Sequence, residues 1–463
     1  MTIKIQLVFA GDHDTPMAAE EVTLLEKNDD CLENLGLTLE ESKEMLGNLQ
    51  RRIVEKQTAT YAELHRACEH CGRPCRRKGF AAVTFRTLFG NVDLKSPRFY
   101  HCRCQEQESK TFSPLTGLLS EHTAPELLFM ETKWASLVSY AMAVRMLKDV
   151  LPVNEKLSSA TARNHLLKVA ERDEAELGEE QYFFIDGCPR DWGELPRPSG
   201  PITVGIDGGY VHDREDRRNH FEVIVGKSVP RDGPAKYFGL VQSHDAKPRR
   251  RLFEVLTSQG MQMNQQVTFL SDGADNLRDL QLYMNPQSEH LLDWFHITMR
   301  LTVLKQYAKG VVKVDKDAGT ALQETLERLK WYLWHGNVCE ALYEIEGLEC
   351  CAEELVDTYP KGRKLGQVVR EFQTYIERNG QFIPNYGERW RHGEAISTAF
   401  VESSVNAVVN KRFCKKQQMQ WSKRGAHLLL QTRTRVLNGE LRSRFQRWYP
   451  NFNVEEQESQ KAA

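Results

Sequence analysis

Two carboxylates follow apolar segments that have the pattern of buried β-strands. Asp207 follows Val204-Gly205-Ile206, and Asp272 follows Phe269-Leu270-Ser271. A third acid, Glu402, lies far downstream in a segment with helical spacing. Mg²⁺, or Mn²⁺ in its place, is held by a few carboxylate oxygens and keeps coordination positions open for a substrate phosphate. Two strand aspartates and a late helical glutamate therefore indicate metal-dependent phosphodiester chemistry on DNA.

The elements around these acids follow a recognisable order. The predicted elements are strands at 202–206, 221–227, 237–241 and 266–270, with a helix at 248–260 before the last strand. This is the order of an RNase H-like core, in which the first and fourth strands lie side by side. Asp207 and Asp272 are therefore expected to share two metal ions about 4 Å apart. Taken singly, Asp207 could merely form a turn, and Asp272 could merely cap the next helix.

The stretch between Asp272 and Glu402 is mostly helical in pattern and far longer than such a core needs. We expect a helical insertion at 301–395, which divides the core into residues 200–300 and residues 396–450. Just before it lie Asp293 and His296, which are three residues apart and so share one helical face. His296 could orient a carboxylate or a DNA strand, or it could be a satisfied core histidine.

Cysteines upstream have the spacing of metal ligands. The expected zinc ligands are Cys68, Cys71, Cys102 and Cys104. They flank a segment that reads as two strands around a Gly90-Asn91 turn, so residues 67–115 resemble a zinc ribbon with a structural Zn²⁺. The second pair has one intervening residue where two are usual, and Cys75 or His101 could replace a ligand. Reduced cysteines in a small core would be the alternative.

The regions flanking the ribbon are predicted to be largely helical. Residues 1–66 combine an N-terminal strand with a helix that starts at a capping box. Residues 120–180 contain two helices separated by a proline, which resembles a DNA-binding helix-turn-helix. Its second helix carries Arg163, Asn164 and Lys168 as candidate DNA contacts. An ordinary helical hairpin would show the same pattern.

Composition limits the class of protein. The 463 residues favour two or three domains. A net charge of −2, from 62 basic and 64 acidic side chains, gives no sign that the whole chain binds nucleic acid. The sequence has no run of about 18 apolar residues and no start like a signal peptide, so we expect a cytoplasmic protein. The fold class that these patterns predict is multi-domain α/β, ending in a polar tail at 451–463.

Basic residues are concentrated after Glu402. The residues expected to contact DNA phosphates there are Lys411, Arg412, Lys415, Lys416, Lys423 and Arg424. Trp421 could stack on an unpaired base near a cleaved end, or it could pack in the core.

As a set, these motifs resemble the bacterial insertion-sequence DDE transposases of the ISKra group, which are related to Mutator-like transposases. The set comprises the cysteine pairs around Arg86–Val92, the two aspartate strands, Asp293–His296, and Val401–Ser403 followed by Lys415–Ser422. The resemblance covers most of the chain. It implies that Asp207, Asp272 and Glu402 are the catalytic acids and that Asp293 with His296 corresponds to the family's C/D-x-x-H motif. It also implies that the zinc module and the upstream helices bind the terminal inverted repeats of the element.

The activity implied is hydrolysis at an element end, followed by attack of the freed 3′-hydroxyl on target DNA at the same acidic site. Joining two ends implies a homodimer or a larger oligomer. One alternative is an ATP-dependent sugar kinase of the actin-like fold, since Gly205–Gly209 resembles its phosphate loop, but no hydroxyl residue follows the glycines as that loop requires. The other is a catalytically inactive DNA-binding or regulatory derivative, although all three acids are present.

Overall fold

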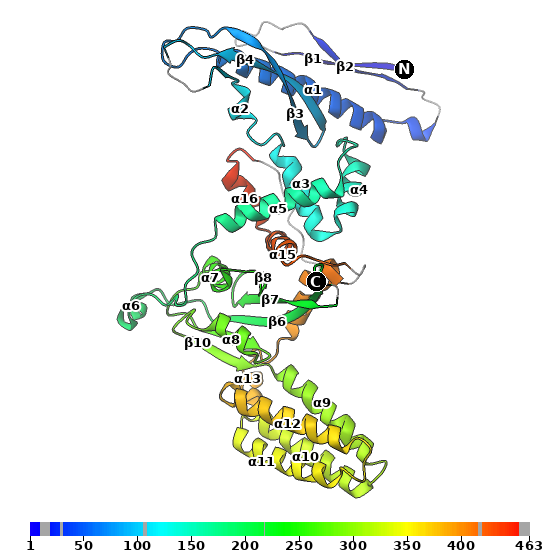
Figure 1. The fold of residues 1–463 in the computed structure, drawn as a ribbon, viewed down its shortest axis with the longest axis vertical. Helices are drawn as coiled ribbons and strands as arrows, with labels where there is room; N and C mark the ends of the chain where they lie inside the picture. The colour runs from blue at the N-terminus through cyan, green and yellow to red at the C-terminus, as the bar shows by residue number, and fades with distance from the viewer. Residues whose placement is uncertain (10–18, 28–30, 105–108, 217, 415–418, 453–463) are drawn as a thin grey trace. The chain divides into compact units, whose positions relative to one another are not determined.

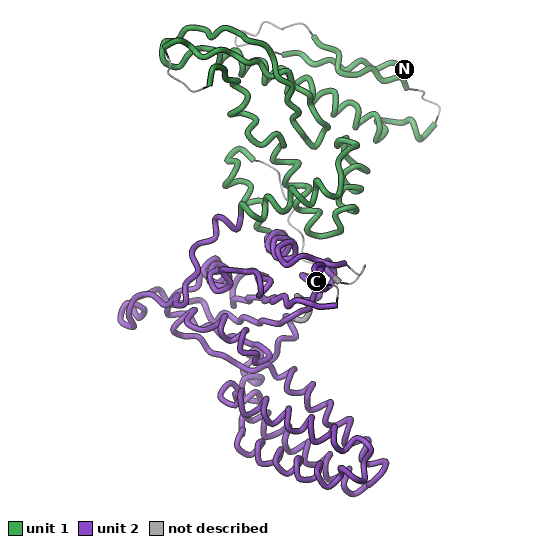
Figure 2. Tube along the Cα trace, viewed as in Figure 1, with its two compact units in different colours: residues 1–172, 439–463 green, residues 173–438 purple. Residues whose placement is uncertain are grey.

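The computed structural model describes residues 1–9, 19–27, 31–104, 109–216, 218–414 and 419–452, apart from the side chains of residues 402, 404 and 414. Most of the expected polar tail therefore lies outside the described residues. The chain divides into two compact units, residues 1–172 with 439–463 and residues 173–438 (Figure 2).

The first unit opens with a two-stranded ribbon and a long helix. Strand β1 (Thr2–Leu7) pairs antiparallel with β2 (Glu20–Glu26), and helix α1 spans Leu39–Leu64 (Figure 1). Thr38 precedes α1, accepts a hydrogen bond from the Glu41 backbone N–H and donates its own backbone N–H to the Glu41 carboxylate. This is the capping box that the sequence predicted.

A β-hairpin follows α1, as expected. Strands β3 (Arg77–Thr87) and β4 (Gly90–Tyr100) pair along their length, and the short β5 (Thr111–Phe112) adds a third strand. Gly90 has a φ of +104°, which favours glycine, so the tight turn forms at the predicted place. Helix α1 packs against β4. A single turn of helix, α2 (Leu115–Leu118), ends this part.

Helices complete the first unit. Helices α3 (Pro125–Leu137), α4 (Tyr140–Val150) and α5 (Ser159–Ala175) follow one another, and α16 (Leu441–Trp448) packs against α3. Pro152 lies in the break between α4 and α5, where the sequence predicted it to separate two helices.

The second unit is built on a five-stranded mixed sheet. Its elements are α6 (Pro189–Glu194), β6 (Ile202–His212), β7 (His220–Pro230), β8 (Lys236–Val241), α7 (Pro248–Ser258), β9 (Val267–Ser271), α8 (Asp275–Gln281) and β10 (Ser288–Leu292). The strand order is β10-β9-β6-β7-β8. Strands β6, β7 and β8 are antiparallel neighbours, whereas β9 runs parallel to both β6 and β10. The prediction that the first and fourth strands of this region lie side by side is confirmed.

The strand that carries Asp207 is longer than predicted. Strand β6 continues to His212 and stays paired with β7 throughout, with Asp207 opposite Val225. Neither Gly208 nor Gly209 has a positive φ, so both continue the strand. The expected strand end at residue 206 is therefore wrong, and the interpretation of Asp207 as a turn residue falls with it. The reason is that an antiparallel partner extends the strand through two glycines whose sequence signals a break.

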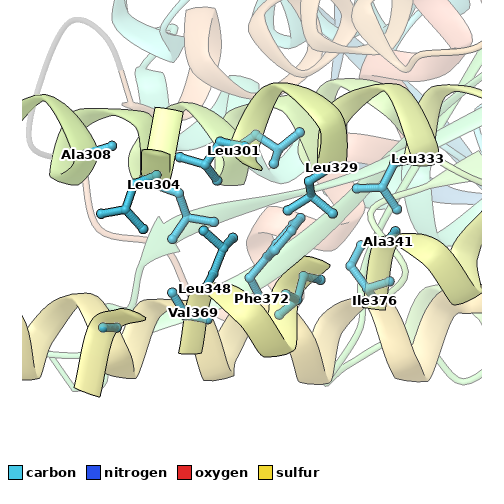
Figure 3. Packing of buried hydrophobic residues seen from close by; sticks show 14 of the residues in the cluster. Leu301, Leu304, Ala308, Leu329, Leu333, Ala341, Leu348, Val369, Phe372 and Ile376 are labelled. Atoms are coloured by element: carbon cyan, nitrogen blue, oxygen red, sulfur yellow. The ribbon is translucent and has the colours of Figure 1, made fainter. Parts of the chain in front are cut away.

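Helices dominate the chain between β10 and the last part of the second unit. These helices are α9 (Trp294–Val311), α10 (Lys316–Trp334), α11 (Val338–Glu354), α12 (Gly362–Asn379) and the short α13 (Tyr386–Arg391). Each of the first three packs on the next, and α12 also packs on α9. Leucines and larger side chains such as Phe372 fill the space between them (Figure 3). Tyr386 belongs to the same core. The predicted helical region exists and begins at Trp294, earlier than expected.

The chain then returns to the sheet. Helix α14 (Ala399–Val405) packs on β6 and β7, and it continues into a π-helical segment, Asn406–Cys414. Helix α15 (Lys423–Leu437) packs on β8. Among the described helices, none is both long and apolar enough to cross a membrane.

A buried arginine joins distant parts of the second unit. Arg251 of α7 is 6 % exposed, and its guanidinium donates to Glu174, Asp245 and Gln431 at 2.8 Å each. Glu174, Asp245 and His427 offer ligand atoms close enough together to hold a metal ion, but Arg251 already supplies the positive charge there. The arginine thereby ties α7 to the end of α5, the loop after β8, and α15.

The same network makes stability depend on pH. Burial by itself raises the pKa of Glu174, but hydrogen bonds from His427 and Arg251 outweigh it and lower this pKa to about 2 from a usual 4.5. A carboxyl whose pKa is depressed by folding stabilises the protein above its unfolded pKa. This stabilisation is therefore present above about pH 4.5 and is lost as the pH falls toward 2.

We expect Arg251→Met to lower the free energy of unfolding by about 3–5 kcal/mol at pH 7, because the buried Asp245 carboxylate and the half-buried Glu174 carboxylate lose their cation. The loss should shrink at about pH 4, where Glu174 of the variant takes up a proton. Urea unfolding at both pH values measures this. Arg363→Met, at an exposed position of α12, is the control and should change stability by less than about 0.5 kcal/mol. Equal losses at the two pH values would contradict the linkage.

Candidate functional site

The four predicted cysteine ligands lie together. The sulfur atoms of Cys68, Cys71, Cys102 and Cys104 are all within 4.8 Å of one another. Cys68 Sγ is 3.5 Å from Cys104 Sγ, and Cys71 Sγ is 3.6 Å from Cys102 Sγ. The first pair lies between α1 and β3 and the second follows β4, so the hairpin brings the two pairs together. This cluster could hold a structural Zn²⁺.

The two alternative ligands are not part of the cluster. His101 Nε2 is 3.2 Å from the Ser109 hydroxyl. Cys75 is buried beside Phe99, and burial followed by the charges of the neighbouring cysteines raises the pKa of its thiol. Cys75 packs next to the cluster but is not among the four cysteines whose sulfur atoms lie close enough to share one ion.

The electrostatics of the cluster favour a cation. A backbone hydrogen bond at Cys104 and then thiol contacts lower the pKa of Cys102 to about 7. A backbone hydrogen bond at Cys71 lowers the pKa of Cys68, whereas the contact with Cys102 raises that of Cys104 well above its usual value. Four thiols this close cannot all ionise unless a cation compensates the charge.

A second candidate site surrounds Asp207, which projects from the face of β6 that α14 covers. Along a strand, Gly205, Asp207 and Gly209 lie on one face. A Cβ at Gly205 would collide with Val401 of α14, and a Cβ at Gly209 would lie 3.6 Å from Val405. The absence of a side chain at Gly205 thus lets α14 lie directly on the strand beside Asp207, whereas Gly209 has room for a Cβ. Helix α14 carries Glu402, whose side chain lies outside the described residues.

Asp272 follows the last residue of β9, next to β6. Its Oδ1 accepts the Ala274 backbone N–H at 2.9 Å, and its carbonyl oxygen accepts the Tyr375 hydroxyl at 2.9 Å. The N-cap of α8 is Ala274, so Asp272 is not the capping residue of that helix. The sheet order therefore brings Asp272 to the neighbourhood of Asp207, as predicted.

Burial and repulsion act on Asp207 together. Burial is the main cause that raises its pKa, and the charges of Asp272 and Asp293 raise it further. A backbone hydrogen bond from Gly208 and the charge of His296 act in the opposite direction. Three carboxylates and one imidazole are thus close enough to affect one another electrostatically.

Asp293 is buried, and its carboxylate holds several parts of this centre together. It is 0 % exposed; its Oδ1 accepts the Phe295 backbone N–H at 2.8 Å as the N-cap of α9, and its Oδ2 accepts His296 Nδ1–H at 2.8 Å. The Thr398 hydroxyl also donates to Oδ2. One carboxylate therefore starts α9, orients an imidazole and fixes the chain just before α14.

The neighbouring charges keep His296 cationic over a wider pH range. Burial by itself lowers the pKa of His296. The hydrogen bond to Asp293 and the charges of Asp293, Asp272 and Asp207 outweigh burial and raise the pKa above its usual value. His296 therefore offsets part of the repulsion among the acids.

Sequence reasoning missed two residues next to Asp272. Glu222 of β7 accepts a hydrogen bond from Asn276 at 3.1 Å, and burial, then the charge of Asp272, raise its pKa. Tyr375 comes from α12 in the helical region. Glu222 occupies an ordinary position in the alternating pattern of a strand, and Tyr375 occupies an ordinary position in the pattern of a helix. The local sequence therefore does not mark either residue as part of a site.

The predicted DNA contacts fall into four groups. Asn164, Lys168, Lys411 and Arg424 are exposed, and Arg163 and Lys423 are half-buried. Lys415 and Lys416 lie outside the described residues. Arg412 and Trp421 are only 4 % and 6 % exposed.

Burial argues against DNA contacts by Arg412 and Trp421. The Arg412 guanidinium lies 5.2 Å from the Trp421 ring centroid, and Trp421 packs on Phe413 at 4.8 Å. The Trp421 backbone N–H donates to His212 at the end of β6, which draws this segment inward. Trp421 is a core residue, which was one of the two interpretations of the sequence, and the prediction of a surface role for Arg412 is wrong.

The chain matches no model of a known protein family, and no curated protein sequence matches it significantly. The chemistry of both sites therefore has to be argued from their residues and geometry.

For the cysteine cluster, we expect the purified chain to contain one Zn²⁺ and Cys71→Ser to lower both the zinc content and the melting temperature, because a structural site contributes folding energy. Metal analysis and thermal unfolding measure these quantities. Cys339→Ser, at an exposed thiol of α11, should leave both unchanged. Cys75→Ser should retain the zinc, and loss of the metal from this variant would mean that the ligand set is different.

For Asp293, we expect Asp293→Ala to lower the free energy of unfolding by about 2–4 kcal/mol, since a helix cap and buried hydrogen bonds to His296 and Thr398 are lost. Asp293→Asn should lose less, because asparagine still caps α9 through its side-chain oxygen. Denaturant unfolding of the two variants measures the difference. Equal stability of Asp293→Ala and the unchanged chain would refute the organising role.

Proposed function

We propose that this chain is a DNA transposase that cleaves DNA and transfers the cut strand with Asp207, Asp272 and Glu402 as its catalytic acids. The observation that carries the proposal is the sheet order β10-β9-β6-β7-β8, with Asp207 on β6 and Asp272 at the end of adjacent β9. Three antiparallel strands followed by two parallel ones is the arrangement of RNase H-like nucleases and transposases. The helix that carries Glu402 packs on the Asp207 face of β6.

The acidic centre has the chemistry of a divalent-cation site. Asp207 is half-buried close to Asp272 and Asp293, and the raised pKa of Asp207 reflects the unfavourable partial burial of its charge. A cation would relieve it, so Asp207, Asp272 and Glu402 are the residues that would hold Mg²⁺ or Mn²⁺. Such ions, when bound, activate the attacking oxygen and stabilise the departing one.

Asp293 and His296 have supporting roles in the centre. Asp293 positions the His296 imidazole, and His296 offsets negative charge. Asp293 holds His296 in place through its Nδ1–H. The imidazolium reduces the repulsion between the acids while no substrate is bound, and its other nitrogen can donate to a phosphate oxygen. Hydrolysis at one strand and attack by the freed 3′-hydroxyl at another are both in-line displacements at phosphorus, so one set of acids serves both steps.

DNA recognition is assigned to the first unit and to the basic residues after α14. The zinc-ribbon-like hairpin and the exposed Asn164 and Lys168 of α5 are proposed to bind terminal inverted repeats. Lys411, Lys423 and Arg424 are proposed to contact phosphates, which gives salt-sensitive affinity. Joining two element ends implies at least a homodimer.

The backbone conformation of Gly205–Gly209 argues against the kinase alternative. Residues Gly205–Gly209 continue β6 as paired strand, with a helix packed on the glycines, so they do not form an open phosphate loop. An inactive derivative of a transposase is separated from the enzyme only by an activity measurement.

The test of activity is Mg²⁺-dependent cleavage of a plasmid that carries the DNA flanking the coding sequence. We expect Asp207→Asn, Asp272→Asn and Glu402→Gln each to lower cleavage by at least about 100-fold while DNA binding persists, because loss of a metal ligand costs more than loss of its supporting groups. Asp279→Asn, at an exposed position of α8, is the control and should cleave normally. Normal cleavage by any of the three variants would remove that acid from the site.

A second readout does not depend on cleavage. Without divalent metal, we expect Asp207→Asn to raise the melting temperature by about 2–4 °C, since it removes a carboxylate that is unfavourably buried. Added Mg²⁺ should raise the melting temperature of the unchanged chain and have little effect on this variant, because binding to the folded state stabilises it. A lower melting temperature for Asp207→Asn would refute the electrostatic argument.

A further inference from the structure

A cavity of about 300 Å³ opens beside Asp272, where the end of β9 and the start of α8 meet helices α9 and α12. Its wall includes Asp272, Arg278, Arg300, Glu371, Tyr375 and Arg378. Three arginines from three different helices thus face one small space next to a proposed catalytic acid. The sequence prediction of DNA contacts did not include any of them.

Arg300 is held in place beside the acidic centre. Its guanidinium carbon lies 4.1 Å from the ring centroid of Tyr375. Burial raises the pKa of Tyr375, so the hydroxyl keeps its proton, and it donates to the Asp272 carbonyl oxygen at 2.9 Å. A guanidinium stacked on a ring keeps its N–H edge available for a bidentate acceptor. The contact through Tyr375 fixes Arg300 relative to Asp272.

The three arginines differ in how their charge is balanced. Arg278 is paired with Asp275 and lies 5.0 Å from the Phe382 ring centroid. Within the described part of the chain, neither Arg300 nor Arg378 has a carboxylate within salt-bridge distance. Arg300 and Arg378 therefore bring two positive charges to the cavity that no acid neutralises directly.

The acids of the cavity wall differ in the same way. Asp275 pairs with Arg278, whereas the hydrogen bond that Glu371 accepts at 2.8 Å comes from the neutral amide of Gln367, so Glu371 keeps its charge. Asp272 belongs to the proposed catalytic centre, where a bound cation would compensate its charge. Arg300 on α9 and Arg378 on α12 are the cations of the wall that form no salt bridge within the described residues, and two guanidinium groups suit the two free oxygens of a phosphodiester.

We infer that this cavity binds a backbone phosphate of the DNA strand beside the bond that is cut, with Arg300 and Arg378 as positioning residues. The inference rests on the proposed function, and it assigns the helical region a direct role in holding the substrate. A cavity of this volume is at the lower limit of ligand pockets, so it takes one phosphate with its sugar and not a duplex. Such a contact sets the register of the strand without reading bases.

The experiment measures binding of the full chain to a labelled duplex of the DNA flanking the coding sequence, without divalent metal, at several salt concentrations. The variant is Arg300→Gln with Arg378→Gln. The matched control is Lys309→Gln with Arg363→Gln, which makes the same charge change at exposed positions of α9 and α12 outside the cavity. Thermal unfolding verifies that both proteins are folded.

We expect the cavity variant to bind about tenfold more weakly and the slope of log K against log salt to fall by about 1, as one phosphate contact is lost. The control should bind within about twofold of the unchanged chain. This pattern supports the inference whatever Asp207→Asn does to cleavage. If the cavity variant and the control weaken DNA binding equally, the inference about the cavity is overturned. The proposed activity is unaffected by that result and is still tested by the cleavage measurements on Asp207→Asn, Asp272→Asn and Glu402→Gln. No salt-dependent binding by the unchanged chain overturns both proposals.

Discussion

The candidate active site depends on one fully buried carboxylate, that of Asp293. Its oxygens accept hydrogen bonds from the Phe295 backbone N–H in the first turn of α9, from the imidazole of His296 and from the hydroxyl of Thr398. These three donors compensate for the burial of the carboxylate. The Trp294 backbone N–H donates to Ile396 at 3.1 Å beside it. The chain therefore leaves the sheet and returns to it at the same point, and the helical region is attached without disturbing the register of the strands.

This junction explains how residues distant in sequence come to lie around Asp272. Tyr375 reaches back from α12 to the Asp272 carbonyl, and Tyr386 donates to the Leu292 carbonyl at 2.8 Å. Both hydroxyl groups bond to backbone at the ends of neighbouring parallel strands. The apolar core of the helical region includes Leu292, so the packing of the helices continues into the sheet. Rigidity at the site thus comes from the helical region as much as from the sheet.

The sequence predicted well what local patterns encode. Apolar runs identified the strands, and ligand spacing identified the cysteines, since both signals lie within a few residues of the groups concerned. The placement of β6 beside β9 came from the order of the predicted elements, which is that of an RNase H-like core. Contacts between distant segments carried no such signal, which is why Glu222 and Tyr375 were missed. The burial of Arg412 escaped prediction for a similar reason. A long, charged side chain is typical of a surface residue. In the structure, the segment that contains Trp421 pairs with the end of β6 and covers Arg412.

Gly205 limits how this protein can evolve. The glycine contributes no functional group, yet a side chain there would push α14 away from the strand and move residue 402 relative to residue 207. Substitution at this position is therefore restricted by packing, and related chains should retain glycine there. The spacing Gly-x-Asp-x-Gly also looks like a nucleotide-binding loop in a sequence. In this protein the motif lies within a β-strand, at a place where a helix packs closely on that strand.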